Sequence, residues 1–276
     1  MRREPLLRLD TFDLAGIAWR VECGERAFGA LLASRYAEFA TDDPPELSLR
    51  VEVRPPPAEG EAAGWTGPFA RIGRTGGLLA FEGANFRGTF DEQSGQGWIV
   101  QPPDPAPLET FLAAVFARRL LREGGFLLHA AGIVAEHGAS VFFGPSGSGK
   151  TTVAGLVGEG VISDDIVAIR RNGDGFRVWG VPWRGHRRSA PLAALFRLRK
   201  AAETAFVPLS SAEAVRELLT SVCFSRPDRE EAERFLEIAG GLLTRVPAYE
   251  MRFTPDPSFW RAMPRNGPRE GNGVSL

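Results

Sequence analysis

The chain has 276 residues, of which 43% are hydrophobic, and this length can bury one large core or two smaller ones. Its formal net charge of −1 argues against the strongly basic surface that binds nucleic acids or anionic membranes. The first residues lack the apolar run of a signal peptide, and no apolar segment approaches membrane-spanning length. We therefore expect a cytoplasmic protein with no nucleic-acid or membrane partner. Its two cysteines, Cys23 and Cys223, are expected to be reduced.

Residues 1–104 are predicted to form a β-rich amino-terminal module. The segment 47–53, LSLRVEV, alternates apolar and polar side chains with the period of a strand. Residues 25–39 have the spacing of one amphipathic helix. Because nothing in this module has catalytic spacing, a recognition or scaffolding role is expected. Shorter apolar runs that end at glycine and turn residues predict strands at 17–22, 77–83, 85–90 and 97–102.

A second domain is predicted over residues 108–263, after a proline-rich linker at 102–107. Apolar residues recur at helical spacing from Leu108 to Leu120, and Gly124 and Gly125 end that helix. The next segment, from residue 126 to residue 143, has the pattern of a β-hairpin.

One strand is predicted at 160–171 and another at 176–181, with a turn between them. The last third of the chain, after these strands, is expected to be helical. Ser210 and Glu213 have the spacing of a capping box, and apolar residues from 232 to 243 form a core-facing helical stripe. Residues 248–253 predict a late strand. The last residues, 264–276, are too poor in apolar side chains to fold and are expected to be a flexible tail.

The segment 144–151, GPSGSGKT, matches the phosphate-loop pattern G-x-x-x-x-G-K-[ST], with a predicted strand before it and a predicted helix after it. Glycines let successive backbone amides turn inward toward phosphate oxygens, and the helix start adds its own amides and dipole. The motif predicts binding of ATP or another nucleoside triphosphate together with Mg²⁺. The residues expected to bind the nucleotide are Gly144, Pro145, Ser146, Gly147, Ser148, Gly149, Lys150, Thr151 and Thr152.

The use of lysine at position 150 supports this interpretation. Lys150 and Lys200 are the only lysines among the 33 lysine and arginine residues of the chain. A compact ammonium on a flexible stem can lie along the loop and reach the β- and γ-phosphates, whereas a planar guanidinium is too bulky. We expect the hydroxyl of Thr151 to complete the coordination of Mg²⁺.

Two adjacent carboxylates, Asp164 and Asp165, follow Lys150 after one short helix and one strand. Adjacent residues of a strand point to opposite faces, so both can serve one site only where the chain turns. One carboxylate could then hold Mg²⁺ while the other takes a proton from an attacking hydroxyl. The alternative is a solvated turn with two acids.

Residues 182–188, PWRGHRR, form a basic segment in which Arg184, His186, Arg187 and Arg188 fall within five residues. Arg184 could neutralise charge on a transferred phosphoryl group, or it could belong to a solvated loop that precedes a helix. Arg187 and Arg188 are expected to be solvated. Residues 196–200 are expected to end a helix, which gives Lys200 a structural role.

The sequence LHAAGIVAEHGASVFFGPSGSGKTT, with GEGVISDDIVAI shortly after it, resembles the catalytic core of bacterial HPr kinase/phosphorylase and its relatives. These relatives include serine kinases encoded beside genes for peptide natural products, and the core is akin to ATP-dependent phosphoenolpyruvate carboxykinase. The resemblance implies an α/β fold with a P-loop catalytic domain of this kind behind the β-rich module. It also implies that Asp164 is the metal-side acid, that Asp165 is the base, and that His129 lies close to the transferred phosphate.

The expected function is therefore ATP- and Mg²⁺-dependent phosphoryl transfer to a hydroxyl, with a serine of a peptide or small protein as the acceptor. The residues expected to act in catalysis are Asp165, Asp164, His129, Lys150 and Arg184. A small-molecule kinase and a nucleotide-binding regulator that transfers nothing remain alternatives, as does a core position for His129. The acceptor and the oligomeric state, including a homo-oligomer, are left open.

Overall fold

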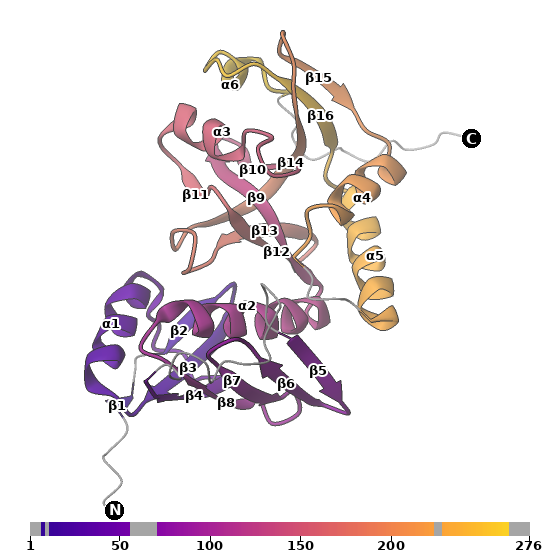
Figure 1. The fold of residues 1–276 in the computed structure, drawn as a ribbon. Helices are drawn as coiled ribbons and strands as arrows, with labels where there is room; N and C mark the ends of the chain where they lie inside the picture. Colours follow the sequence, from indigo (N-terminus) through magenta and orange to yellow (C-terminus); the bar gives the residue numbers. More distant parts are fainter. Residues whose placement is uncertain (1–6, 9–10, 56–70, 224–227, 265–276) are drawn as a thin grey trace, which may run out of the picture. The chain divides into compact units, whose positions relative to one another are not determined.

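The computed structural model describes residues 7–8, 11–55, 71–223 and 228–264. The protein is a mixed α/β protein, and the described residues form two β-sheets of eight strands each (Figure 1). The chain divides into two compact units, Met1–Phe116 and Ala117–Leu276, and the division falls within helix α2 (Pro105–Arg122). Except for residue 264, the tail predicted at 264–276 lies outside the described residues.

The first unit confirms the prediction of a β-rich amino-terminal region. Its sheet has the strand order β1-β3-β4-β8-β7-β6-β5, and β2 pairs with β3. In β4 the side chains of Leu47, Leu49 and Val51 are buried, while those of Arg50 and Glu52 are exposed, as the alternation predicts. The strands are β1 (Leu7–Arg8), β2 (Phe12–Leu14), β3 (Ile17–Cys23), β4 (Leu47–Val53), β5 (Arg71–Thr75), β6 (Leu78–Glu82), β7 (Arg87–Asp91) and β8 (Gln96–Gln101).

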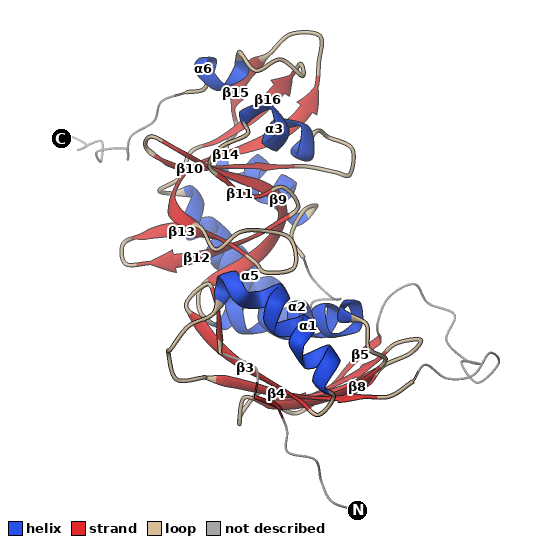
Figure 2. Cartoon of the chain, turned by 90° about the vertical axis from the view of Figure 1, so that its left-hand side faces the viewer, coloured by secondary structure: helices blue, strands red, loops and turns tan. Residues whose placement is uncertain are grey.

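Helices α1 (Arg26–Tyr36) and α2 lie on the same face of this first sheet (Figure 2). Helix α1 begins after Glu25, whose carboxylate accepts hydrogen bonds from the amides of the first turn. A short 3₁₀ turn, η1 (Ala37–Phe39), follows it. Helix α2 begins at Pro105, so the linker predicted at 102–107 is partly wrong. A proline at the first helical position lacks only an amide that would have had no partner in the helix.

The second unit contains a sheet with the order β10-β9-β12-β13-β14-β16-β15, and β11 pairs with β9. Because β10 also pairs with β14, five of these strands form a closed circuit. The predicted hairpin is confirmed by β9 and β10. The strands are β9 (Gly125–Ala135), β10 (Gly138–Phe143), β11 (Val161–Ser163), β12 (Ile166–Asn172), β13 (Gly175–Gly180), β14 (Ser189–Lys200), β15 (Ala205–Pro208) and β16 (Ala248–Phe253).

Helices pack on the strands of this second sheet in two separate apolar clusters (Figure 1). One cluster takes in α4 (Ser211–Leu219) and α5 (Arg229–Leu243), and the other takes in α3 (Lys150–Val157) and α6 (Phe259–Ala262). The capping box at Ser210 and Glu213 is confirmed. In the predicted stripe on α5, Phe235, Ala239 and Leu242 are buried, but Leu236 is 46% exposed and was wrongly assigned to it.

Two predictions for the second unit are wrong. Residues 189–200, part of which was predicted to end a helix, form the long strand β14. The good helix formers of this segment are overridden because β14 pairs with β10, β13 and β16, and because side chains on both faces are buried in the middle of the strand, at Ala194, Leu195 and Phe196. The single strand predicted at 160–171 is divided into β11 and β12 by a bend at Asp164 and Asp165.

Candidate functional site

The candidate site lies at the carboxyl end of β10, where the chain leaves Phe143 and enters the glycine-rich loop. Phe143 pairs with Ala130 of β9 on one side and with Arg197 of β14 on the other. The loop therefore has two flanks, one built from β9 and the segments that pair with it, and one built from β14 and β16. We call them the β9 flank and the β14 flank.

The loop has a conformation that requires glycine at three positions. Gly144, Gly147 and Gly149 have φ values of 148°, 76° and 112°, which residues other than glycine rarely adopt. At Gly144 a β-carbon would lie 3.1 Å from the hydroxyl oxygen of Ser148 and 3.3 Å from the carbonyl oxygen of Leu198. The loop is therefore shaped by backbone torsions, as an anion cradle requires.

Helix α3 begins directly behind the loop. Its amino-terminal cap is Gly149, which has no side chain to accept a hydrogen bond from the first amides. Thr151 and Thr152 are exposed on the first turn. The start of α3 thus presents amides and the positive end of the helix dipole without a side-chain cap, which suits a phosphate group.

Lys150 folds back onto the loop. Its side chain is buried, and its ammonium donates hydrogen bonds to the carbonyl oxygens of Gly144 (2.9 Å) and Pro145 (3.2 Å). Burial lowers the pKa of Lys150, and the negative charge of Asp165 opposes that shift. The ammonium is therefore held inside the loop, within electrostatic reach of the acid on the β9 flank.

The loop also contains a buried hydroxyl whose hydrogen-bonding capacity is unused. The Oγ of Ser148 is buried and has no hydrogen-bond partner among the described residues. A buried polar atom without a partner costs free energy unless a ligand or water satisfies it. With the glycine conformations, the uncapped helix start and the Lys150 ammonium, this orphaned hydroxyl makes the loop a fit for a triphosphate.

The residues expected to bind a metal are more exposed than Lys150 and Ser148 of the loop. Thr151 is exposed on α3, and Asp164 lies half-buried in the bend between β11 and β12 with no ion pair among the described residues. The described residues include no cluster of three or more His, Cys, Asp or Glu side chains. Mg²⁺ at a triphosphate needs only one or two protein ligands besides phosphate oxygens, so Thr151 and Asp164 are a donor set of the right chemistry.

Asp165 is the centre of an ionic cluster on the β9 flank. One carboxylate oxygen lies 2.9 Å from the Nδ1 of His129, and the other lies 3.2 Å from the Nε of Arg184. The backbone of Asp165 is fixed as well, because its carbonyl accepts a hydrogen bond from the amide of Ala130 (2.9 Å) and lies 2.8 Å from the Nδ1 of His129.

The loop that carries Arg184 is tied to the same bend by Ser163. The Ser163 hydroxyl donates a hydrogen bond to the carbonyl of Arg184 (2.7 Å) and accepts one from the amide of Asp165 (3.2 Å). Arg184 itself is 64% exposed, and Arg187 and Arg188 are also exposed. The side chain of Arg184 pairs with Asp165 despite this exposure.

The structure therefore brings His129, Asp165 and Arg184 into contact and places Lys150 within electrostatic reach of Asp165, although the four residues come from four separate segments of the sequence. His129 is not a buried core residue, because 38% of its side chain is exposed. Asp164, unlike Asp165, forms no ion pair with His129 or Arg184.

Sequence reasoning missed Cys223, which follows α4. Its amide donates to the carbonyl of Leu127, two residues before His129. Burial, and to a smaller degree the charge of Asp165, raises the pKa of the Cys223 thiol to about 11. No motif surrounds this cysteine, so the sequence offered no signal for its position beside the cluster.

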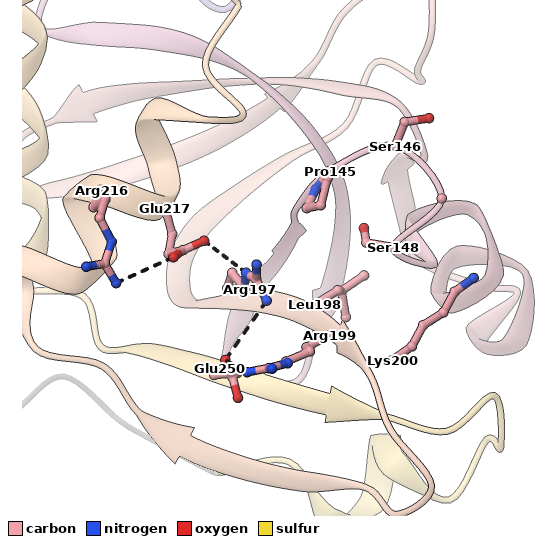
Figure 3. Close-up of a pocket in the computed structure, with 11 residues that line it drawn as sticks. Pro145, Ser146, Ser148, Arg197, Leu198, Arg199, Lys200, Arg216, Glu217 and Glu250 are labelled. Carbon is pink, nitrogen blue, oxygen red and sulfur yellow. Dashed lines mark hydrogen bonds and ion pairs between the residues drawn. The ribbon is translucent and has the colours of Figure 1, made fainter.

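Sequence reasoning also missed a cavity of about 540 Å³ on the β14 flank (Figure 3). Loop residues 145–148 form one of its walls. The charged side chains around it, which were predicted to belong to helix ends or were not singled out, are Arg197, Arg199, Lys200, Arg216, Glu217 and Glu250.

Comparison of the chain with models of known protein families gives no match, and comparison with curated proteins gives none. Within the described ranges, no helix combines the length and the apolar character needed to cross a membrane.

Proposed function

We propose that the protein is an ATP-dependent kinase with a P-loop domain of the HPr kinase and phosphoenolpyruvate carboxykinase type. It transfers the γ-phosphoryl group of ATP to a hydroxyl, with a serine of a peptide or small protein as the acceptor. The observation that carries the proposal is the position of Asp165, which is paired with His129 and Arg184 and acts electrostatically on the lysine of the phosphate loop.

Binding of ATP rests on the loop and the start of α3. The amides of residues 146–151 and the dipole of α3 attract the phosphates, and the Ser148 hydroxyl would gain the partner that it lacks. The ammonium of Lys150 would exchange its carbonyl partners for phosphate oxygens, which carry more negative charge. Thr151 and Asp164 would hold Mg²⁺, which supplies positive charge to the phosphates when it is bound.

Phosphoryl transfer is assigned to the β9 flank. The acceptor oxygen forms a bond to the γ-phosphorus as the bond to the β–γ bridging oxygen breaks, ADP leaves, and the hydroxyl proton passes to the carboxylate of Asp165. His129 holds this carboxylate in place, while Arg184 neutralises charge on the transferred group. Catalysis is then positioning and charge neutralisation, without a covalent enzyme intermediate.

One observation favours a second candidate, a regulator that binds nucleotide without transferring phosphate. Both carboxylate oxygens of Asp165 are already engaged, one by His129 and one by Arg184. While both contacts stay closed, neither carboxylate oxygen is open to the proton of an acceptor hydroxyl. Catalysis requires that at least one contact opens when an acceptor enters.

The experiment that separates the two candidates is transfer of label from γ-labelled ATP to a pool of serine-containing peptides. We expect labelling by the native chain and a loss of about a thousandfold in Asp165→Asn, with nucleotide affinity retained. Asp174→Asn makes the same change in a turn of the same unit and serves as the matched control. Equal labelling by native chain and Asp165→Asn, or none by either despite ATP binding, would overturn the kinase and leave the regulator.

A further inference from the structure

The cavity on the β14 flank carries an excess of positive charge. Glu250 pairs with Arg197, Arg199 and Arg252 at 3.9, 3.5 and 3.2 Å, and Glu217 pairs with Arg197 and Arg216 at 3.0 and 3.7 Å. Figure 3 shows Arg197 between the two glutamates. Four arginines thus share two carboxylates, which leaves a net positive charge on this flank.

Lys200 adds a further cation at the rim of the cavity. It is exposed and makes no ion pair with any described residue, whereas the neighbouring arginines do. Arg199 and Arg216 are 62% and 72% exposed, so their guanidinium groups can be reached from solvent. The cavity therefore offers several accessible cations, which are not fully neutralised by the protein itself.

The chemistry of the walls argues against the nucleoside of ATP as the occupant. Of the residues that line the cavity, only Pro145 and Leu198 have apolar side chains that could pack against a purine. Nucleoside and cofactor pockets are usually lined mainly by apolar and aromatic groups. A polar, cationic cavity of this size suits an anionic group instead.

The position of the cavity relates it to the acceptor. Loop residues 145–148 form its wall, and Asp165 lies across the sheet, beyond β10 and β9. Three strand spacings amount to at most about 15 Å, which about four residues of extended chain can span. One ligand can thus place a hydroxyl near Asp165 and an acidic group in the cavity.

We propose that this cavity binds acidic side chains that flank the acceptor serine, so that the kinase selects acidic peptides. The inference deepens the proposed function and rests on it for the role of the serine. Carboxylates of the peptide would contact Lys200, Arg199 and Arg216, whose charges the two glutamates do not balance.

The test is binding of a fluorescein-labelled peptide that has one serine and aspartates at the four positions on each side of it. The matched probe has asparagine at every aspartate position. We expect the full chain to bind the aspartate peptide at least tenfold more tightly by fluorescence anisotropy. The double variant Arg199→Gln/Lys200→Gln should lose about tenfold for the aspartate peptide, with no change for the asparagine peptide.

The control variant is Arg229→Gln/Arg234→Gln, which removes the same charge from the surface of α5. Equal binding of the two peptides, or equal losses in the two double variants, would overturn the inference. So would a loss of ATP affinity in Arg199→Gln/Lys200→Gln with peptide binding unchanged, because the cavity would then serve the nucleotide. Charge-selective binding without any phosphoryl transfer would uphold the acidic-peptide site and refute the kinase instead.

Discussion

The two flanks of the phosphate loop differ in how they use charge. On the β9 flank one carboxylate, that of Asp165, lies between one histidine and one arginine. On the β14 flank two glutamates are shared among four arginines, with Lys200 beside them. The first arrangement suits a proton transfer at a fixed atom, and the second suits a steady attraction for anions. In the proposed kinase, the two strands beside the loop therefore separate phosphoryl transfer from recognition of the acceptor.

The largest effect is expected at Lys150 in the loop, and Lys200 on the β14 flank provides the comparison. Lys150→Met should weaken binding of a fluorescent ATP analogue about a thousandfold, because two charge-assisted contacts to phosphate are lost. Lys200→Met should change that affinity less than threefold. Equal losses of ATP affinity in the two variants would contradict the assignment of nucleotide binding to the loop and of anion recognition to the β14 flank.

A smaller effect is expected at Arg184. Arg184→Gln should lower kcat for phosphoryl transfer about a hundredfold, because it removes a cation placed beside the reacting group. Arg188→Gln removes a charge four residues further along the same loop and should leave kcat within twofold. If both substitutions have the same effect on kcat, the contact between Arg184 and Asp165 is structural. Arg184 then has no part in phosphoryl transfer.

The smallest effect is a pH dependence of stability that reports the burial of Cys223, which lies beside the Asp165 cluster on the β9 flank. The pKa of Cys223 is raised from 9.0 to about 11 in the folded chain. Between these values the unfolded chain releases the thiol proton and the folded chain keeps it, so stability falls as pH rises. We expect the native chain to lose about 1 kcal/mol more than Cys223→Ala between pH 8 and pH 10, measured by urea unfolding. Identical losses would place Cys223 in a solvated setting.

Local sequence patterns predicted the parts of the site that depend on local geometry. The glycines of the loop are required by backbone torsions, and the hairpin before it is indicated by two apolar runs with Glu136, His137 and Gly138 between them, so both can be recognised without tertiary information. The bend at Asp164 and Asp165 was not predicted, because residues 160–171 have the pattern of one strand, although two adjacent carboxylates can serve one site only where the chain turns. Their division of labour was not predictable from residues alone, since it depends on the partners of Asp165.

The β14 flank was missed because it depends on pairing between distant segments. Residues 192–200, LAALFRLRK, contain good helix formers, and only their pairing with β10 and β16 makes them a strand. That pairing turns Arg197 and Arg199 from expected helix-end residues into walls of the cavity. Arg216 comes from α4 and Glu250 from β16, so no local motif could join them.

The most direct test of the central claim, that the phosphate loop and the Asp165 cluster form one nucleotide site, uses the three histidines of the chain. Their imidazole nitrogens can be observed by ¹⁵N NMR and assigned with single His→Gln variants while ATP and Mg²⁺ are titrated. His129 lies beside Asp165, whereas His137 lies in the turn at the far end of β10. The account predicts saturable shifts of the His129 signals with those of His137 unmoved. Binding of ATP that leaves His129 unchanged, or no binding at all, would contradict it.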